Sequence, residues 1–296
     1  MIKLYNDDCF KIMPMIESEF IHLILSDIPY GIGYDDWDIL HHNTNIAYGG
    51  SSKAQNEAGG MFKRRGKPLN GWSEADKKIP YEYQKWCSIW SPDWFRILKP
   101  GGSCFIFACR RYAHRCVVAM EDVGFTFKDM IAWDKGHAMF RAQRASAVFE
   151  RRQDKENAEQ WRGWRLANTR PLFEPILWFQ KPYKVGSTIT DNLIDNGVGS
   201  WNKSAFAKYN IGEYEPCSNI IKVKKTKFDV GLHPTQKPIN IIKFLIELTT
   251  LENQIVFDPF MGSGTTGLAC RDLNRSFVGI ELNKSYFKIA KNRIEE

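Results

Sequence analysis

The chain has 296 residues, of which 43% are hydrophobic and 25% are charged. This is the composition of a globular protein, and it excludes a wholly disordered chain. Forty-one Lys and Arg residues against 34 Asp and Glu residues give a formal net charge of +7. That charge is compatible with a nucleic-acid partner without proving one. The length predicts about two domains, or one large α/β domain with an insertion.

Seven scattered cysteines include no Cys-x-x-Cys pair, so the sequence predicts neither a zinc site nor a disulfide framework. Reduced thiols are typical of cytosolic proteins. The apolar runs are short, Cys104 to Cys109 being typical, and Met1 to Phe10 contains no apolar signal core. We therefore expect a cytoplasmic protein that binds no metal and does not enter a membrane.

The first half of the chain predicts strands and helices separated by one long polar connection. Ile21 to Ser26 is a mostly apolar run ending at Asp27, which predicts a buried strand that opens onto a loop. Gly31 to Ile79 is polar and Gly-rich, and connections of this length are typical of mobile lids. The next predicted elements are a helical stretch at Tyr81–Leu98 broken near Pro92, a helix stop and turn at Lys99–Gly102, a strand at Ser103–Ala108, a helix at about Arg111–Val123, and a strand near Phe127–Trp133.

The middle of the chain is basic and weakly patterned. Arg141 to Lys184 holds ten Lys and Arg residues against five Asp and Glu residues, with Pro175–Phe179 inside it predicted as a strand. Thr188 to Pro216 is rich in Asn and Gly. Four lysines between Lys222 and Lys227 fit a solvated face and a phosphate contact about equally well.

The last 65 residues have the clearest pattern. They predict a helix at Ile239–Leu248, a strand at Ile255–Phe257, a helix at Thr265–Leu273, a strand at Phe277–Ile280 and a helix at Ser285–Ile294. Strands and helices alternating in this way indicate a parallel sheet with right-handed crossovers.

A glycine-rich turn follows the strand that ends at Phe257. Three glycines satisfy G-x-G-x-x-G in the strand–turn–helix context of a nucleotide site: Gly262, Gly264 and Gly267. Asp258 faces this turn and would repel a pyrophosphate, but it suits a ligand that carries an ammonium and a sulfonium. Glu281 ends the next strand, where a carboxylate accepts hydrogen bonds from ribose hydroxyls. The pattern favours S-adenosylmethionine over a dinucleotide.

Asp27-Ile28-Pro29-Tyr30 follows the first strong strand, at the sheet edge where α/β proteins place their chemistry. The lone pair of an exocyclic base amine is delocalised into the ring. Two acceptors aimed at its N–H groups favour a pyramidal nitrogen that can attack a methyl sulfonium. Asp27 supplies a carboxylate and Ile28 a backbone carbonyl. Tyr30 offers a ring on which an extruded base can stack.

The chain resembles the β-class S-adenosylmethionine-dependent DNA amino-methyltransferases. Three motifs carry the resemblance: Asp27-Ile28-Pro29-Tyr30, His233-Pro234-Thr235-Gln236-Lys237-Pro238, and Phe257–Thr265 with the sequence FDPFMGSGT. The catalytic motif comes first and the cofactor loop last, the order that defines the β-class. The resemblance covers Lys3–Tyr30, Trp90–Lys135 and His233 to the end. It implies a Rossmann-like α/β fold with a mixed, mostly parallel sheet, helices on both faces and an inserted target-recognition region.

The resemblance also implies roles for individual residues. The catalytic residues are Asp27, Ile28, Pro29 and Tyr30. The cofactor-binding residues are Asp8, Thr235, Gln236, Lys237, Asp258, Phe260, Gly262, Gly264, Thr265 and Glu281, with Thr235, Gln236 and Lys237 on the methionine part, Glu281 on the ribose, and Asp8 on the adenine. Asp7 fits the adenine position equally well. The DNA-binding residues are Lys63, Arg64, Arg65, Lys67, Arg141 and Arg144, and no residue is assigned to a metal.

Ile28 departs from the family, whose commonest tetrapeptide is Asp-Pro-Pro-Tyr. The backbone carbonyl of Ile28 remains available, so this departure does not exclude the chemistry. Asp at the first position resembles the adenine-specific members, whereas methylases of the cytosine amine more often have Ser there. Ser26 lies one residue too early for that role, because Pro29-Tyr30 fixes the register.

We predict three segments: a catalytic half at 1–135 with a lid-like insertion at 31–79, a target-recognition region at 136–228, and a cofactor-binding half at 229–296. The resemblance implies a cytoplasmic enzyme, bacterial or phage-encoded and associated with the nucleoid through DNA. Its partner is double-stranded DNA, and a homodimer and a cognate restriction endonuclease remain open.

The favoured function is methyl transfer from S-adenosylmethionine to the 6-amino group of adenine by direct displacement after base flipping. The nearest alternative is the 4-amino group of cytosine by the same chemistry. Methylation of the cytosine 5-carbon needs a Cys nucleophile, and Pro216-Cys217 lies on the wrong side of the glycine loop. A DNA-binding protein that has lost catalysis and a nicotinamide oxidoreductase are the alternatives from other classes.

Overall fold

The computed structural model describes residues 1–31, 47–48, 64–65, 74–138, 142–166, 168–209, 211, 216–223 and 236–296. Within these residues, eight strands form the central sheet, in the order β1 (Ile2–Tyr5), β12 (Ser276–Ile280), β11 (Ile255–Asp258), β2 (Ile21–Asp27), β5 (Leu98–Phe107), β9 (Phe173–Gln180), β6 (Thr126–Asp134) and β10 (Ile220–Lys222). Neighbouring strands are parallel except where β9 pairs with β5 and with β6. This sheet confirms the predicted α/β fold class.

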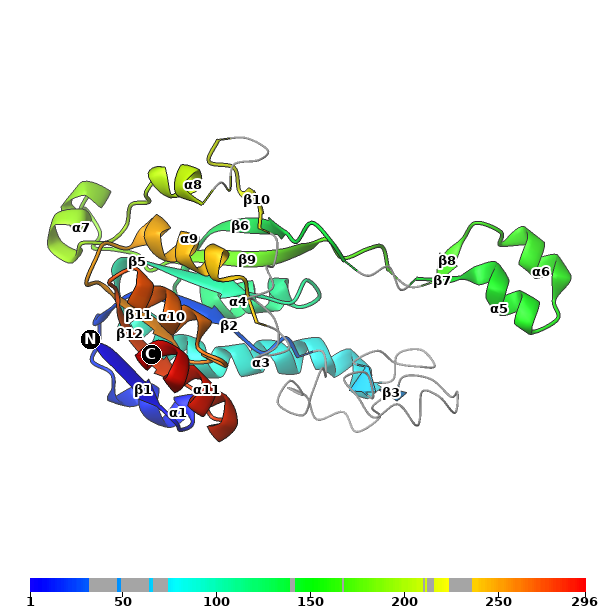
Figure 1. Ribbon diagram of the computed structural model, residues 1–296, viewed down its shortest axis with the longest axis horizontal. Helices are drawn as coiled ribbons and strands as arrows, with labels where there is room; N and C mark the ends of the chain where they lie inside the picture. Colours follow the sequence, from blue (N-terminus) through cyan, green and yellow to red (C-terminus); the bar gives the residue numbers. More distant parts are fainter. Residues whose placement is uncertain are drawn as a thin grey trace.

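Helices cover both faces of the sheet (Figure 1). One face packs against α1 (Cys9–Ile12), η1 (Met13–Met15), α3 (Glu74–Ile97) and α4 (Ala113–Asp122), and the other against α8 (Ser204–Lys208), α9 (Ile239–Thr249), α10 (Thr265–Asp272) and α11 (Lys284–Glu295). Each face of the sheet has its own hydrophobic core, and successive side chains of β2 point alternately into one core and the other. Ile24 lies in the first, whereas Leu23 and Leu25 lie in the second, as the two-residue period of a strand requires.

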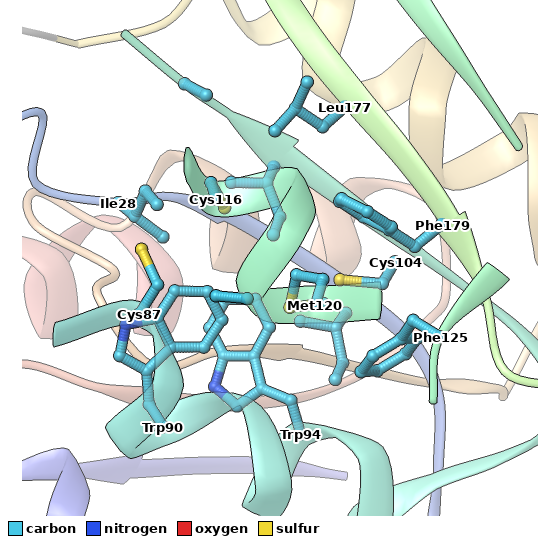
Figure 2. Close-up of a cluster of buried hydrophobic side chains, with 14 of the residues drawn as sticks. Ile28, Cys87, Trp90, Trp94, Cys104, Cys116, Met120, Phe125, Leu177 and Phe179 are labelled. Carbon is cyan, nitrogen blue, oxygen red and sulfur yellow. The ribbon is translucent and has the colours of Figure 1, made fainter. Parts of the chain in front are cut away.

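The long helix α3 corrects the prediction of a helical stretch broken near Pro92. It begins at Glu74 and runs for 24 residues through Pro80 and Pro92. Figure 2 shows why: Trp90 and Trp94 lie one turn apart and are fully buried against side chains of β5, α4 and β9. Burying the apolar area of each indole contributes about 4–6 kcal/mol. Each indole N–H lacks a described partner, which costs roughly 1–3 kcal/mol. The two indoles together still offset the ~3 kcal/mol that Pro92 costs.

Lys99 to Gly102 does not form the predicted turn. The helix does stop, at Ile97, but β5 begins at once with Leu98 and includes all four residues. Ile21 of β2 pairs with Leu98, whereas Leu23 pairs with Ser103, so the register shifts between these two pairs. The residues of β5 between Leu98 and Ser103 therefore form an irregularity within the strand. Gly101 lies there with a φ of +79°, and a Cβ would lie 2.0 Å from the side-chain nitrogen Nδ2 of Asn192.

The basic middle segment contains an arm, defined here as residues 142–166. It consists of the strand pair β7 (Gln143–Arg144) and β8 (Arg165–Leu166), which carries α5 (Ala145–Arg151) and α6 (Lys155–Gln160). Figure 1 shows this arm extending away from the central sheet at the ends of β6 and β9. Further along, α7 (Ile189–Asn196) and α8 occupy a segment whose sequence predicted no elements.

The segment division stays a prediction, although β9 and β10 of the 136–228 segment belong to the central sheet. Between Gly31 and Ile79 the structure describes the strand pair β3 (Ala47–Tyr48) and β4 (Arg64–Arg65), together with the start of α3. Most of the proposed lid therefore lies outside the described residues. No described helix combines the length and apolar character that crossing a bilayer requires.

The C-terminal elements match the predicted pattern, and Gly264 shows what holds them together. Gly264 is the N-cap of α10 with a φ of +81°, and a Cβ there would lie 2.8 Å from the Cβ of Ala290 in α11. We expect Gly264→Ala to lower the free energy of unfolding by roughly 1–3 kcal/mol more than Gly186→Ala does, because overpacking adds to the strain.

Gly186 is the matched control for this prediction. It has a φ of +84°, and among the described residues nothing lies within 4 Å of a Cβ built on it. Urea unfolding of both variants measures the difference. Equal losses of stability would show that the contact with α11 does not constrain Gly264.

Candidate active site

The carboxyl ends of the parallel strands bring three acids to one edge of the sheet. Asp27 ends β2, Asp258 ends β11 and Glu281 follows β12. Because β9 runs in the opposite direction, its first residues lie at the same edge, and Glu174 comes from there. The chain order reverses at β2, which has β11 on one side and β5 on the other, so this edge is the topological switch point where α/β sheets bind ligands.

A cavity of about 590 Å³ opens at this edge. Its wall contains most of the residues that the sequence predicted for catalysis and cofactor binding: Asp8, Asp27, Ile28, Pro29, Tyr30, Gln236, Lys237, Asp258, Phe260, Gly262, Thr265 and Glu281. Thr235 lies outside the described residues. Gly264 is not part of the wall, and its packing against α11 accounts for the glycine instead.

Asp27 is held by Lys237 and still has unused acceptor capacity. The Nζ of Lys237 donates to Asp27 Oδ2 at 2.6 Å, and the Lys237 side chain is 6% exposed. Asp27 Oδ1 is buried, and within the described residues it accepts no hydrogen bond. The Asp27 side chain as a whole is 24% exposed and borders the cavity. A buried acceptor without a donor is costly, which marks it as a position for a ligand donor.

Tyr30 and Glu174 complete the group around Lys237. The hydroxyl of Tyr30 donates to Glu174 Oε1 and accepts from Lys237 Nζ at 3.2 Å. Glu174 Oε1 lies 3.2 Å from Lys237 Nζ, and Glu174 Oε2 lies 3.8 Å from the Nζ of Lys135. Two carboxylates and a phenol therefore surround one buried ammonium.

The close grouping of these side chains shifts the pKa values of Asp27, Lys237 and Tyr30. Burial raises the pKa of Asp27 to about 6, with Lys237 acting against that rise. Burial alone would lower the pKa of Lys237, but Asp27 and Glu174 outweigh it and raise that pKa. Burial and the two carboxylates raise the pKa of Tyr30 well above its ordinary value, so its hydroxyl remains a donor. At neutral pH the group consists of an ammonium, two carboxylates and a protonated phenol.

Asp258 fixes the shape of the glycine loop. Its Oδ1 accepts from Ser26 Oγ at 2.7 Å and from the Phe260 backbone N–H at 3.2 Å, and its Oδ2 accepts from Thr266 Oγ at 2.7 Å. Burial raises its pKa to about 6 against these three bonds. The carboxylate thus ties β2, the loop and the start of α10 together beneath the cavity.

Glu281 borders the cavity from the neighbouring strand. Its two oxygens accept from the backbone N–H of Gly262 at 2.9 Å and of Asn283 at 2.7 Å. Burial raises its pKa to about 7. Each carboxylate oxygen can accept more than one hydrogen bond, so Glu281 can also receive hydroxyl groups of a ligand.

The acid beside α1 that borders the cavity is Asp8. Asp8 is the N-cap of α1 and accepts from the Phe10 N–H at 3.0 Å. Asp7 is paired with Lys11 at 3.2 Å and does not contribute to the wall. Cys9 also borders the cavity, and burial raises its pKa to about 12, which keeps the thiol protonated and poorly nucleophilic.

Aromatic residues form another part of the wall. Phe260 from the glycine loop packs against Trp86 of α3, with ring centroids 5.9 Å apart. Phe107 and Tyr286 also border the cavity. Sequence reasoning identified Phe260 but missed the other three, because their chemistry is ordinary and only the tertiary fold brings them here.

Glu174 is the functional candidate that the sequence analysis missed. It borders the predicted Pro175–Phe179 strand, and a charged residue at the start of a buried apolar run is a usable signal. The signal points to the site only once β9 is known to be antiparallel to its neighbours, because that direction places the start of β9 at the sheet edge that carries Asp27. Lys237, which the sequence analysis assigned to the methionine part of the cofactor, lies in the cavity wall and also contacts Asp27, Tyr30 and Glu174.

Only part of the predicted DNA-binding set can be located. Arg144 is exposed on β7 of the arm, and Arg64 and Arg65 form β4. Lys63, Lys67 and Arg141 lie outside the described residues. Cys217 lies outside the cavity wall, in a backbone conformation with a φ of +59°. In the described ranges, no three His, Cys, Asp or Glu side chains converge to hold a metal ion.

Comparisons with known proteins identify the family of this chain. A family model described as DNA methylase, and named for N6 and N4 methyltransferases, matches residues 21–292. The chain is 59% identical over 292 residues to the Type II methyltransferase M.HindIII of Haemophilus influenzae, covering 98% of this chain and 94% of that protein. It is 25% identical to the Type II methyltransferase M.HpaI of Haemophilus parainfluenzae, covering 99% of this chain and 74% of that protein.

Solved structures share the fold. The cytosine-N4-specific PvuII DNA methyltransferase superposes with a TM-score of 0.62 at 15% identity, covering 99% of this chain and 86% of that one. The M1.HpyAVI–SAM complex gives a TM-score of 0.55 at 24% identity, with both chains fully covered. The family match over most of the chain and the 59% identity to M.HindIII show that this chain belongs to the DNA methylase family.

Proposed function

We propose that the protein transfers the methyl group of S-adenosylmethionine to the 6-amino group of adenine in double-stranded DNA, after the base has been flipped out. The observation that carries this proposal is the Asp27 carboxylate. It borders the cavity, it is fixed by Lys237, and its Oδ1 accepts nothing from the described chain. An exocyclic amine supplies the donors that such an acceptor lacks.

The turn at Asp27 suits a direct displacement. Asp27 and the Ile28 carbonyl accept the two N–H bonds of the amine and leave its lone pair directed at the methyl group. The nitrogen–carbon bond would form as the sulfur–carbon bond breaks with its electron pair left on sulfur, and the methylated nitrogen would then release one proton to water. The hydroxyl of Tyr83 donates to the Pro29 carbonyl at 3.3 Å, which helps to hold the turn. Ile28 in place of the family's proline leaves its carbonyl in position for this role.

The other end of the cavity suits S-adenosylmethionine, which supplies an activated methyl group on a sulfonium. Glu281 offers acceptors for ribose hydroxyls, and Asp258 places negative charge beneath the glycine loop. Four acids in one wall, Asp8, Asp27, Asp258 and Glu281, disfavour the pyrophosphate of a dinucleotide. TTHA0409 of Thermus thermophilus and M1.HpyAVI, which share this fold, have structures named as complexes with this compound.

The arm and the proposed lid supply the DNA contacts in this account. The described arm carries six Arg and Lys residues, Arg144 among them, and exposes Trp164. The cationic side chains suit contacts with DNA phosphates, and an exposed aromatic ring suits contacts with bases. The Type II names of the relatives support a modification role beside a restriction endonuclease.

Asp at the first position of the tetrapeptide supports adenine over cytosine as the methylated base. The 4-amino group of cytosine is the second candidate, since the same acceptors serve it. Digestion of the methylated DNA to nucleosides, followed by mass spectrometry, distinguishes the two. N6-methyladenosine is the expected product, N4-methylcytidine would select the second candidate, and no methylated base from active, cofactor-bound protein would overturn both.

Removing the carboxylate of Asp27 tests the chemistry. We expect Asp27→Ala to abolish transfer of a tritiated methyl group to DNA, because one of the two amine acceptors is lost. Calorimetry on the same variant should show cofactor binding largely retained. Asp195→Ala, which removes an exposed carboxylate from α7, is the control and should keep full activity. Near wild-type transfer by Asp27→Ala would end the proposal.

The pH dependence of transfer has a defined sign. Burial raises the pKa of Asp27 to about 6, and only the ionised carboxylate offers its full acceptor capacity. We therefore expect the single-turnover rate at saturating cofactor to be flat above about pH 7 and to fall below about pH 6. DNA binding measured over the same range separates chemistry from association. A rate that rises on acidification would contradict the assigned role.

Glu281 provides a test of cofactor orientation. Glu281→Ala should weaken S-adenosylmethionine binding by roughly 1–3 kcal/mol, the cost of losing charge-assisted hydrogen bonds. Glu252→Ala removes an exposed carboxylate from the connection before β11 and should leave binding unchanged. Titration calorimetry measures both. Tight binding of NAD by the unmodified protein, with none of S-adenosylmethionine, would restore the oxidoreductase alternative.

A further inference from the structure

We propose that Glu174 is a positioning residue for methyl transfer: it holds Lys237 and Tyr30 so that Lys237 engages one oxygen of Asp27 and the other stays available to the base amine. This inference rests on the proposed function and extends it to a residue from the segment between the catalytic and cofactor motifs. Glu174 does not border the cavity, so it acts through its neighbours and not on the substrate.

The fold gives Glu174 a fixed place. It is the second residue of β9 and pairs with Trp133 of β6, at the end of the sheet that carries the catalytic turn. Its side chain is 15% exposed. Lys135 follows β6 directly, so the two residues that meet at 3.8 Å lie where the strands lead into and out of the arm.

The contacts of Glu174 account for both of its oxygens. Oε1 accepts from the Tyr30 hydroxyl and lies 3.2 Å from Lys237 Nζ, and Oε2 faces Lys135. Because Glu174 does not border the cavity, it cannot reach the base as an acceptor. It can orient a phenol and an ammonium, each of which also lies beside Asp27 or its turn.

The consequence for Asp27 follows from the donors around it. The Tyr30 hydroxyl donates its proton to Glu174, although it also lies close enough to Asp27 to act against the rise in the pKa of that carboxyl. Glu174 also draws Lys237 toward itself, so the ammonium bridges two carboxylates instead of engaging both oxygens of one. Without Glu174, Tyr30 and Lys237 would both turn to Asp27 and occupy the oxygen that the amine needs. The result is a slower chemical step with the cofactor and DNA sites intact.

Glu174→Gln tests this inference because it removes the charge while preserving the shape. We expect the single-turnover rate to fall roughly tenfold or more, as for other misplaced reacting groups. Dissociation constants for S-adenosylmethionine and DNA should stay within about twofold of those of the unmodified protein, so that the loss lies in kcat and not in KM. Glu247→Gln is the matched control: Glu247 is also largely buried and paired with a lysine, Lys208, away from the cavity.

The pH profile distinguishes positioning from general damage. Among the described residues, the charged or titratable groups around Glu174 and Asp27 are Lys237, Tyr30, Lys135, Cys109, Arg110 and Asp258. The negative charge of Glu174 helps to raise the pKa of Asp27. Its removal should therefore move the acid limb of the rate profile to lower pH. A variant that is merely partly unfolded would show a lower rate at every pH, with the fall at acidic pH in the same place.

Tyr30→Phe keeps the test decisive even if Glu174→Gln folds poorly. This variant retains the ring and removes the hydroxyl that donates to Glu174. We expect the double variant with Glu174→Gln to lose less than the product of the two single losses, because both changes break one linked group. Glu174→Asp should recover part of the rate.

The outcomes separate this inference from the proposed function. Unmodified protein that transfers no methyl group would remove the proposed function itself. Active protein whose Glu174→Gln variant keeps its rate and its acid limb would overturn only the positioning role. Loss of cofactor binding in Glu174→Gln would also overturn it, by showing a structural effect on the whole cavity.

Discussion

The buried ion pair between Asp27 and Lys237 is the interaction on which the rest of the site depends. Removing both charges from water costs several kcal/mol for each, and that cost is recovered only through close, well-directed contacts. At 2.6 Å the pair makes such a contact, with Glu174 adding a second carboxylate and Tyr30 a hydroxyl. The arrangement fixes Asp27 while leaving acceptor capacity that no described donor uses.

The sheet is what brings these groups together. Parallel strands direct Asp27, Asp258 and Glu281 to one edge, and the reversed strand β9 adds Glu174 at the same edge. Asp258 at the end of β11 and Glu281 just after β12 stabilise the glycine loop through hydrogen bonds to backbone and hydroxyl groups. Asp27 is left with a different task, because its principal partner is a cation and not the backbone.

Sequence analysis could predict the parts of the site in which a few adjacent residues are enough to identify the motif. The tetrapeptide at Asp27 and the glycine loop at Gly262 each combine a strand end with a turn, and both line the cavity. The last 65 residues followed their predicted elements because period and turn signals agreed there. β1 went unpredicted, since four residues at a sheet edge, half of them exposed, leave little pattern.

What could not be predicted depends on contacts distant in sequence. The pairing of Lys237 with Asp27 spans 210 residues, and the Tyr30–Glu174 bond spans 144. Glu174 also needed the direction of β9, which single-strand patterns do not encode. Gly264 was predicted as a ligand contact; it does not line the cavity, and a Cβ there would meet Ala290 of α11, a contact that the sequence pattern does not reveal. Helix α3 passes through Pro92 because its buried tryptophans outweigh the cost of the proline.

The central claim is that Asp27 keeps an acceptor for the amine of a flipped base. A crystal structure with cognate DNA and a non-reactive analogue of S-adenosylmethionine measures this directly. The account predicts that the oxygen of Asp27 not engaged by Lys237 lies within roughly 2.7–3.2 Å of the exocyclic nitrogen of an extruded adenine. A flipped base whose amine lies beyond reach of Asp27, with both carboxylate oxygens occupied by protein donors, would contradict it.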